Sequence, residues 1–227
     1  MDWTKISTDP NDSNAMRAVH EHLHSIRVVD DENVYIDWVV NRVRNRSCLD
    51  VGAVEHDMSY VEKDTWKHKK LIDSASKVVG VDIIEEYVNE LNSRGYDIRL
   101  CDATSDKYIG EQFDVVVIGD VLEHVTNVQG LLDFSLRHLK EDGEIIVKTP
   151  NPHYRSFIKS FIKKKFYINL EHVAWYSPSQ VLEIARRSGC TLESYRISYT
   201  EGKRWYWRFV NPELFSQDYV FIFTHKK

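Results

Sequence analysis

Four aspartates stand where short apolar runs of the sequence end. The runs are rich in valine and isoleucine, and the aspartates that close or follow them are Asp50, Asp82, Asp102 and Asp120. A carboxylate in such a place can accept hydrogen bonds from a ligand, and Asp82 could accept from both hydroxyls of a ribose. Aspartate also caps the helix that follows a strand, so any single one could be structural. Together, the four favour a ligand site along one edge of a sheet.

A lone glycine lies just beyond the first of these runs, in "SCLDVGAVEHD". Gly52 would let the backbone approach a ligand closely. The glycine-rich fingerprints of dinucleotide and triphosphate loops are absent, because Ala53, Val54 and Glu55 follow. Since Glu55 would repel a pyrophosphate, we expect a ligand that carries an ammonium group and no phosphate.

Three histidines fall where a second reactant would lie. His124 follows the fourth apolar run and is expected to begin a helix, His153 follows the fifth run, and His172 lies in an insertion after it. Histidine is the natural general base near neutral pH. We favour His124 and His172 as catalytic residues, although each could equally be a partly exposed or capping histidine.

The elements that must position these residues alternate in type. Strand-like runs are expected at 47–51, 77–82, 97–101, 113–120 and 143–149. Helix-like stretches lie at 14–25, 34–45, 84–95, 127–143 and 177–190, and Gly143 is expected to end the fourth of them. Two final strands, 191–200 and 218–227, follow without an intervening helix. The pattern predicts a Rossmann-like α/β fold, with a seven-stranded, mostly parallel sheet, helices on both faces and a C-terminal antiparallel hairpin.

Length and composition limit the remaining possibilities. The 227 residues fit one domain, 1–227, divided into N-terminal helices (1–45), a ligand-binding core (46–150), a lid or acceptor insertion (151–176) and a C-terminal helix with strands (177–227).

A formal charge of −5 argues against nucleic acid as a partner. The three cysteines lack metal-type spacing, and no secretory signal begins the sequence, so we expect reduced thiols and a cytoplasmic protein. Nothing in the sequence indicates the oligomeric state.

Two surface segments could contact an acceptor. The run "RSFIKSFIKKK" at 155–165 carries five basic residues and no acid beside an apolar helical face. It could be a lid over an anionic or lipid-linked acceptor, a helix that contacts a membrane peripherally, or simply a solvated amphipathic helix. Trp205, Trp207 and Phe209 alternate and could stack on a sugar, although packing within the terminal hairpin is the safer interpretation.

The order of these motifs resembles the class I S-adenosylmethionine-dependent methyltransferases over about residues 45–190. The matching stretches are "CLDVGAVEHD", "VVGVDI", "CDATS", "FDVVVIGDVLEHV" and "LKEDGEIIVKTPNP". The resemblance implies S-adenosylmethionine as the cofactor. By position it implies Asp50, Gly52 and Ala53 at the methionine end, Asp82 and Ile83 at the ribose, Asp102 and Ala103 at the adenine, and Asp120 near the sulfonium. Two glycines of the usual first motif are missing, as in a branch of the family that shares the "WKHKKL" helix at 66–71.

The segments "LEHV", "TPNP" and "EHVAWYSPSQVLEIARRSGC" are most similar to methyltransferases of quinone, small-molecule and cell-surface glycan pathways, many of which act on oxygen. We therefore expect methyl transfer to a hydroxyl of a small molecule or glycan precursor. Asp120, Glu123 and His124 also resemble a magnesium-binding cluster of some quinone-pathway relatives, but these residues are equally the polar face of a helix start, and no metal is expected. The alternatives are a non-catalytic nucleoside-binding module and an NAD-dependent oxidoreductase; the missing glycine fingerprint disfavours the second.

Overall fold

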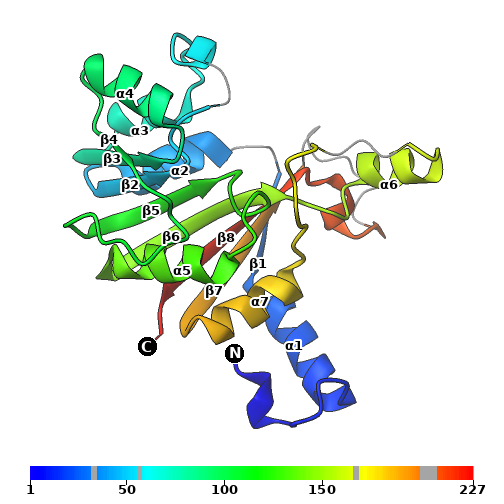
Figure 1. The fold of residues 1–227 in the computed structure, drawn as a ribbon. Helices are drawn as coiled ribbons and strands as arrows, with labels where there is room; N and C mark the ends of the chain where they lie inside the picture. Colours follow the sequence, from blue (N-terminus) through cyan, green and yellow to red (C-terminus); the bar gives the residue numbers. More distant parts are fainter. Residues whose placement is uncertain (32–34, 56–57, 166–168, 200–208, 227) are drawn as a thin grey trace.

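The computed structural model describes residues 1–31, 35–55, 58–165, 169–199 and 209–226, and its centre is one mixed sheet (Figure 1). The strand order is β1-β7-β8-β6-β5-β2-β3-β4. Only β8 runs antiparallel to its neighbours β6 and β7, and the other pairs among the described residues are parallel. The strands are β1 (Arg27–Asp30), β2 (Ser47–Val51), β3 (Lys77–Asp82), β4 (Ile98–Leu100), β5 (Phe113–Gly119), β6 (Leu139–Pro150), β7 (Cys190–Ser198) and β8 (Asp218–His225).

Helices cover both faces of the sheet, as the sequence predicts. On one face α1, α5 and α7 pack on a core that includes Leu131 and Leu182, and on the other α2 and α3 bury Val39 and Leu71 (Figure 1). The helices are α1 (Ser13–Ile26), α2 (Tyr35–Val43), α3 (Lys67–Ile72), α4 (Glu85–Ser93), α5 (Val128–Arg137), α6 (Arg155–Ile162) and α7 (Pro178–Arg187), with single turns at η1 (Trp3–Lys5), η2 (Met58–Tyr60) and η4 (Pro212–Phe215). No helix within the described ranges has the length and hydropathy needed to cross a membrane.

The predicted α/β fold with its terminal antiparallel hairpin is confirmed, and the structure adds an eighth strand. The added strand, β1, pairs in parallel with β7 from Arg27 opposite Tyr195 to Asp30 opposite Ser198. Its four residues carry too short an apolar pattern to be recognised as a strand. The N-terminal segment therefore extends the sheet as well as supplying helices.

The end of α5 differs from the prediction. The helix stops at Arg137, and β6 begins at Leu139, so Gly143 lies inside a strand instead of ending a helix. A β-carbon at Gly143 would lie 2.7 Å from Leu139 Cδ1 and 3.0 Å from the carbonyl oxygen of Asp114. The glycine therefore serves close packing between β6 and β5, where the strand register shifts.

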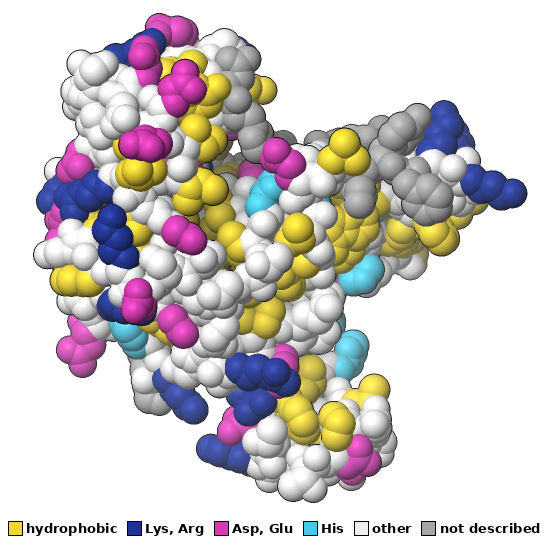
Figure 2. Space-filling view, viewed as in Figure 1, with side chains coloured by type: hydrophobic (Ala, Val, Ile, Leu, Met, Phe, Trp, Pro, Cys, Tyr) yellow, Lys and Arg dark blue, Asp and Glu magenta, His cyan; other side chains and the backbone are white. Residues whose placement is uncertain are grey.

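The basic helix α6 projects from the body of the molecule. Figure 2 shows lysine and arginine side chains at its tip and hydrophobic side chains along one side. Phe161 is 68% exposed and Ile162 is 74% exposed. Of the predicted aromatic sugar-stacking residues, Trp205 and Trp207 lie outside the described residues, and Phe209 is exposed.

Candidate functional site

A cavity of about 1010 Å³ opens at the carboxyl ends of β2, β3 and β5. Strands β2 and β5 are neighbours in the sheet, with β3 on the far side of β2 and β6 on the far side of β5. The strand order therefore reverses direction between β2 and β5, and α/β sheets bind ligands at such a switch point. The cavity is lined by residues from each of the predicted motifs. They include Tyr35, Gly52, Val54, Glu55, Lys67, Asp82, Ile83, Asp102, Ala103, Asp120, His124, Lys148, His172 and Asp218.

Asp82 is positioned by the backbone around it. Its Oδ1 accepts hydrogen bonds from the amides of Ile83 (2.7 Å) and Ile84 (3.1 Å), and its Oδ2 accepts from the amide of Val54 (3.0 Å). The carboxylate thus fixes the start of α4 and the turn after β2 together, while the residue lines the cavity. Oδ1 is filled by its two amide donors, whereas Oδ2 accepts one hydrogen bond and keeps acceptor capacity toward a ligand, which suits a ribose hydroxyl.

The next wall of the cavity is formed at the end of β4. Asp102 Oδ1 accepts from the amide and hydroxyl of Thr104 at 2.8 and 2.7 Å, so the turn after the strand is fixed by its own side chain. Ala103 is 9% exposed, and Ile83, which faces the same cavity, is 70% exposed. A flat base could lie between such apolar side chains with Asp102 at its rim.

Gly52 is required by its backbone conformation. Its φ is +68°, in the left-handed region, and a β-carbon there would lie 2.4 Å from Val121 Cγ2. The neighbouring Ala53 is buried and does not line the cavity; its carbonyl accepts a hydrogen bond from Trp66 Nε1 at 3.2 Å. The turn is therefore a defined structure with one obligatory glycine.

Asp50 lies behind the cavity wall. Its side chain is fully buried and is paired with Lys67 Nζ at 2.7 Å and with His68 Nδ1 at 2.9 Å. It does not line the cavity, whereas Lys67 does. The structure thus places a lysine between this predicted ligand-binding carboxylate and the space a ligand would occupy.

Asp120 lines the cavity and is also paired with a lysine. Its two carboxylate oxygens lie 2.7 and 2.8 Å from Lys148 Nζ, which is also 3.5 Å from Asp218 Oδ2. Burial alone would lower the pKa of Lys148, but the two carboxylates raise it, so the lysine stays charged. Asp120 itself has a φ of +57°, in the left-handed region that few residues other than glycine adopt.

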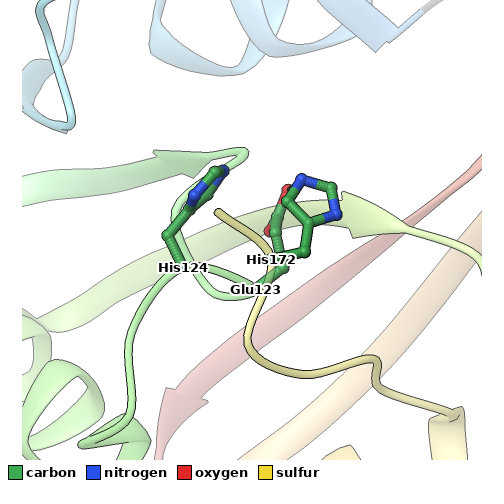
Figure 3. A group of neighbouring side chains, drawn as sticks. All are labelled: Glu123, His124 and His172. Carbon is green, nitrogen blue, oxygen red and sulfur yellow. Dashed lines mark ion pairs between the residues drawn. The ribbon is translucent and has the colours of Figure 1, made fainter. Parts of the chain in front are cut away.

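Glu123, His124 and His172 form a cluster at the far side of the cavity (Figure 3). The two imidazole rings are 4.8 Å apart and perpendicular, and His172 Nε2 lies 3.9 Å from Glu123 Oε1. The amide of Val173 donates to the carbonyl of Glu123 at 2.9 Å, which ties the insertion to the turn after β5. The cluster is therefore built from two segments distant in sequence. His124 lies in that turn and does not begin a helix, since α5 starts at Val128.

The carboxyl group of Glu123 has an unusual environment. It is almost fully buried, its Oε2 accepts from Thr149 Oγ1 at 2.8 Å, and its Oε1 accepts no hydrogen bond from the described residues. Burial raises the pKa of Glu123 to about 7. Burial and the adjacent His124 lower the pKa of His172, so this imidazole is neutral and able to take a proton at pH 7.

His153 is not brought to this cluster. Its Nδ1 lies 3.0 Å from the hydroxyl of Tyr219, and the residue lines a separate cavity beside α1 and α7. The choice of His124 and His172 over His153 thus agrees with their placement, although their catalytic role stays a prediction.

The cluster could also hold a metal ion. Glu123, His124 and His172 each offer one ligand atom, and these atoms lie within 4.8 Å of one another. Two imidazoles and one carboxylate suit zinc or iron better than magnesium, which prefers oxygen ligands. Asp120, which the magnesium resemblance includes, is paired with Lys148 instead.

Comparison with known proteins decides the family. Residues 32–195 match the model of a family described as a methyltransferase domain. The chain belongs to this methyltransferase family. The ubiquinone biosynthesis O-methyltransferase of Azoarcus sp. (strain BH72) is 23% identical over 167 residues, covering 70% of this chain and 71% of that protein. The enzyme of the same name from Nitrosomonas europaea is 22% identical over 164 residues, covering 68% of each.

Solved structures show the same fold for this methyltransferase. An S-adenosylmethionine-dependent methyltransferase from Clostridium acetobutylicum has a TM-score of 0.59 at 12% identity, covering 94% of this chain and 99% of that one. Magnesium protoporphyrin IX methyltransferase from Synechocystis, with bound SAH, has a TM-score of 0.57 at 12% identity, covering 99% and 93%. The sequence-based prediction of a class I methyltransferase is confirmed, which sets aside the oxidoreductase alternative.

Sequence reasoning missed two lysines of the methyltransferase site. Lys67 and Lys148 line the cavity and pair with two of the four strand-ending aspartates. Lys148 stands in an apolar strand, "GEIIVKT", where a buried lysine signals a partner, and that signal was available in the sequence. Lys67 opens a helix among three other basic residues, so nothing in its pattern distinguishes it.

Proposed function

We propose that this methyltransferase transfers a methyl group from S-adenosylmethionine to a hydroxyl oxygen of a small-molecule acceptor. The observation that carries the proposal is the position of neutral His172, which lines the cavity with its Nε2 3.9 Å from the buried carboxyl of Glu123. A hydroxyl must lose its proton as its oxygen is methylated, and an imidazole whose lowered pKa keeps it neutral at pH 7 has a free nitrogen to accept it. The named O-methyltransferases among the relatives support the same reaction.

The proposed cofactor position follows the cavity walls. Asp82 accepts from the ribose hydroxyls, with Ile83 against the ribose, while Asp102 and Ala103 hold the adenine. Gly52 leaves room for the amino-acid tail. When bound, the cofactor supplies a methyl group on a positively charged sulfur.

The chain's own residues then align the acceptor and remove its proton. Asp120 gives the cavity a carboxylate near the sulfonium, partly compensated by Lys148. His172 takes the hydroxyl proton. The ring of His124 packs against that of His172, and the backbone hydrogen bond between Val173 and Glu123 holds the segment in place. Alignment of reactants can supply about 7 to 11 kcal/mol, and a general base contributes roughly 10²- to 10⁴-fold. Positioning is therefore the larger part of the catalysis.

The experiment is a transfer assay with methyl-labelled S-adenosylmethionine and three acceptor sets: phenols and catechols, sugars or lipid-linked sugars, and amines. We expect the label in a methyl ether of a hydroxyl acceptor. Label only on amines would contradict oxygen methylation. Tight binding of S-adenosylhomocysteine with no transfer to any acceptor in a source extract would favour the non-catalytic module.

Helix α6 is proposed as the contact to an anionic or lipid-linked acceptor. Its exposed Phe161 and Ile162 are followed by three lysines, 163–165, and a cavity of about 520 Å³ lies between the helix and the segment that carries His172. Cosedimentation with anionic but not neutral lipid vesicles would support a membrane contact, and equal recovery with both would contradict it.

Three further expectations accompany this function. The described cysteines are all free and buried, which supports a cytoplasmic location. One sheet that joins the N-terminal, central and C-terminal segments supports a single methyltransferase domain. We also expect turnover to survive dialysis against EDTA, because base catalysis needs no ion; a loss that a divalent cation restores would assign the histidine cluster to a metal.

A further inference from the structure

Lys67 lies at the switch point of the sheet. It is the first residue of α3, and its ammonium group is placed between the ends of β2 and β5, where it pairs with Asp50 Oδ1 at 2.7 Å and donates to the carbonyl of Gly52 at 3.4 Å. A β-carbon at Gly119 would lie 3.1 Å from Lys67 Nζ, so glycine at the end of β5 gives the lysine its space. The side chain is 15% exposed and lines the large cavity.

The first three amides of the neighbouring turn are already used within the protein. The amides of Gly52 and Ala53 both donate to the carbonyl of Val81, at 3.0 and 3.3 Å, and the amide of Val54 donates to Asp82 at 3.0 Å. Glu55, the next residue, lines the cavity and adds negative charge. A carboxylate that enters this end of the cavity therefore finds no donor in the turn's first three residues.

Lys67 can supply the missing donor. An ammonium group has three N–H bonds. Among the described residues, the oxygens paired with Lys67 are those of Asp50 and Gly52, which leaves capacity toward the cavity. Asp50 is also held by His68, so its charge is shared between two partners. With Glu55 on the same wall, the cavity end offers one cation and one anion, which matches the charges of an amino acid in its zwitterionic form.

We propose that Lys67 binds the carboxylate of the cofactor's amino-acid tail, in place of the backbone amides that the glycine-poor turn has lost. This inference rests on the proposed function, because it assumes that S-adenosylmethionine occupies the cavity. It makes Lys67 the residue that distinguishes the cofactor from its decarboxylated form. It also gives Asp50 a positioning role, which is to hold Lys67 at the cavity wall.

The test is a two-by-two comparison of dissociation constants by calorimetry. The ligands are S-adenosylhomocysteine and its decarboxylated analogue, S-adenosyl-3-thiopropylamine, and the proteins are the wild type and Lys67→Gln. The wild type should bind the decarboxylated analogue roughly 10- to 100-fold more weakly than S-adenosylhomocysteine. For Lys67→Gln, the dissociation constants of the two ligands should differ by less than about 3-fold. Lys69→Gln is the matched control, since Lys69 lies on the same helix but pairs with exposed Asp64; it should behave like the wild type.

The other outcomes separate a failure of the inference about Lys67 from a failure of the proposed function. If both ligands bind the wild type equally, or if Lys67→Gln keeps the full preference for the carboxylate, the inference is wrong while the cofactor site stands. If neither ligand binds the wild type, the proposed function fails first. Should Lys67→Gln not fold, the wild-type comparison still decides whether the carboxylate is recognised, and Lys67→Met provides a second neutral variant.

Discussion

The four strand-ending aspartates are of two kinds. Asp82 and Asp102 accept hydrogen bonds from the turns around them, and no lysine within the described ranges is paired with either. Asp50 and Asp120 are each held by a lysine. The same residue type at equivalent places in the sheet thus serves two purposes. We call the part of the cavity around Asp82 and Asp102 the nucleoside half, where we expect the carboxylates to face the ligand. The part around Asp50 and Asp120 is the transfer half, where each carboxylate holds a lysine at the cavity wall.

The first prediction concerns the nucleoside half. Asp82→Ala should weaken binding of S-adenosylhomocysteine roughly 10²- to 10⁴-fold, because charge-assisted hydrogen bonding to the ribose is lost together with the amide contacts that shape this part of the cavity. Asp82→Asn keeps one oxygen for the amides that Asp82 caps, so it separates ligand binding from local folding. Calorimetric titration measures both variants. If Asp82→Asn bound S-adenosylhomocysteine as tightly as the wild type, the carboxylate of Asp82 would not bind the ligand. The proposed difference from Asp50 and Asp120 would then be wrong.

The second prediction concerns the transfer half. His172→Ala should lower kcat roughly 10²-fold or more and leave the affinity for S-adenosylhomocysteine nearly unchanged, because the imidazole removes a proton and does not hold the cofactor. His124→Ala should lower kcat as well, since it packs on His172. His153→Ala is the control and should keep wild-type turnover. Normal turnover in both cluster variants would end the general-base hypothesis.

The third prediction tests the turn between the two halves. Gly52→Ala should lower the free energy of unfolding by about 2–5 kcal/mol, from the left-handed backbone and the overlap with Val121. Gly110 also has a positive φ, +92°, but a β-carbon there meets nothing within 4 Å. Gly110→Ala should therefore cost only about 1–2 kcal/mol. Equal losses in urea denaturation would show that the contact with Val121 contributes nothing.

The smallest expected effect comes from Glu123. Its pKa is raised from 4.5 to about 7 in the folded chain, so its contribution to stability is complete below pH 4.5 and is lost as pH rises toward 7. Glu123→Gln lacks this titration and should become the more stable protein as pH rises from 5 to 8, by up to about 3 kcal/mol. Urea denaturation at several pH values measures the difference. A difference independent of pH would show that the carboxyl is ionised throughout.

The regular part of the fold could be predicted because its signals are local. Apolar runs of valine and isoleucine mark β3 and β5 to within a residue, and Ser177 with Pro178 marks the start of α7, where the structure has a capping box with Gln180. The end of α5 could not be read in this way. Glycine often ends a helix, which is why a helix end is expected at Gly143. In the structure, however, this glycine is required by the close packing between β5 and β6, which its local sequence does not reveal.

The candidate site likewise has residues that local sequence could predict and contacts that it could not. Residues at or just beyond the ends of strands, such as Asp82 and Asp102, could be placed at the cavity from sequence, because parallel strands end at one edge. The partnership of Asp50 with Lys67 and the approach of His172 to Glu123 join segments distant in the chain. Such contacts depend on how α3 and the insertion fold back over the sheet, which no local pattern specifies.

The most direct test of the account is a crystal structure with S-adenosylhomocysteine bound. It should show the ribose hydroxyls on Asp82, the adenine beside Ala103 and the sulfur toward His172. A nucleoside bound elsewhere, or an empty cavity at saturating ligand, would contradict the assignment of this sheet edge as the methyl-transfer site.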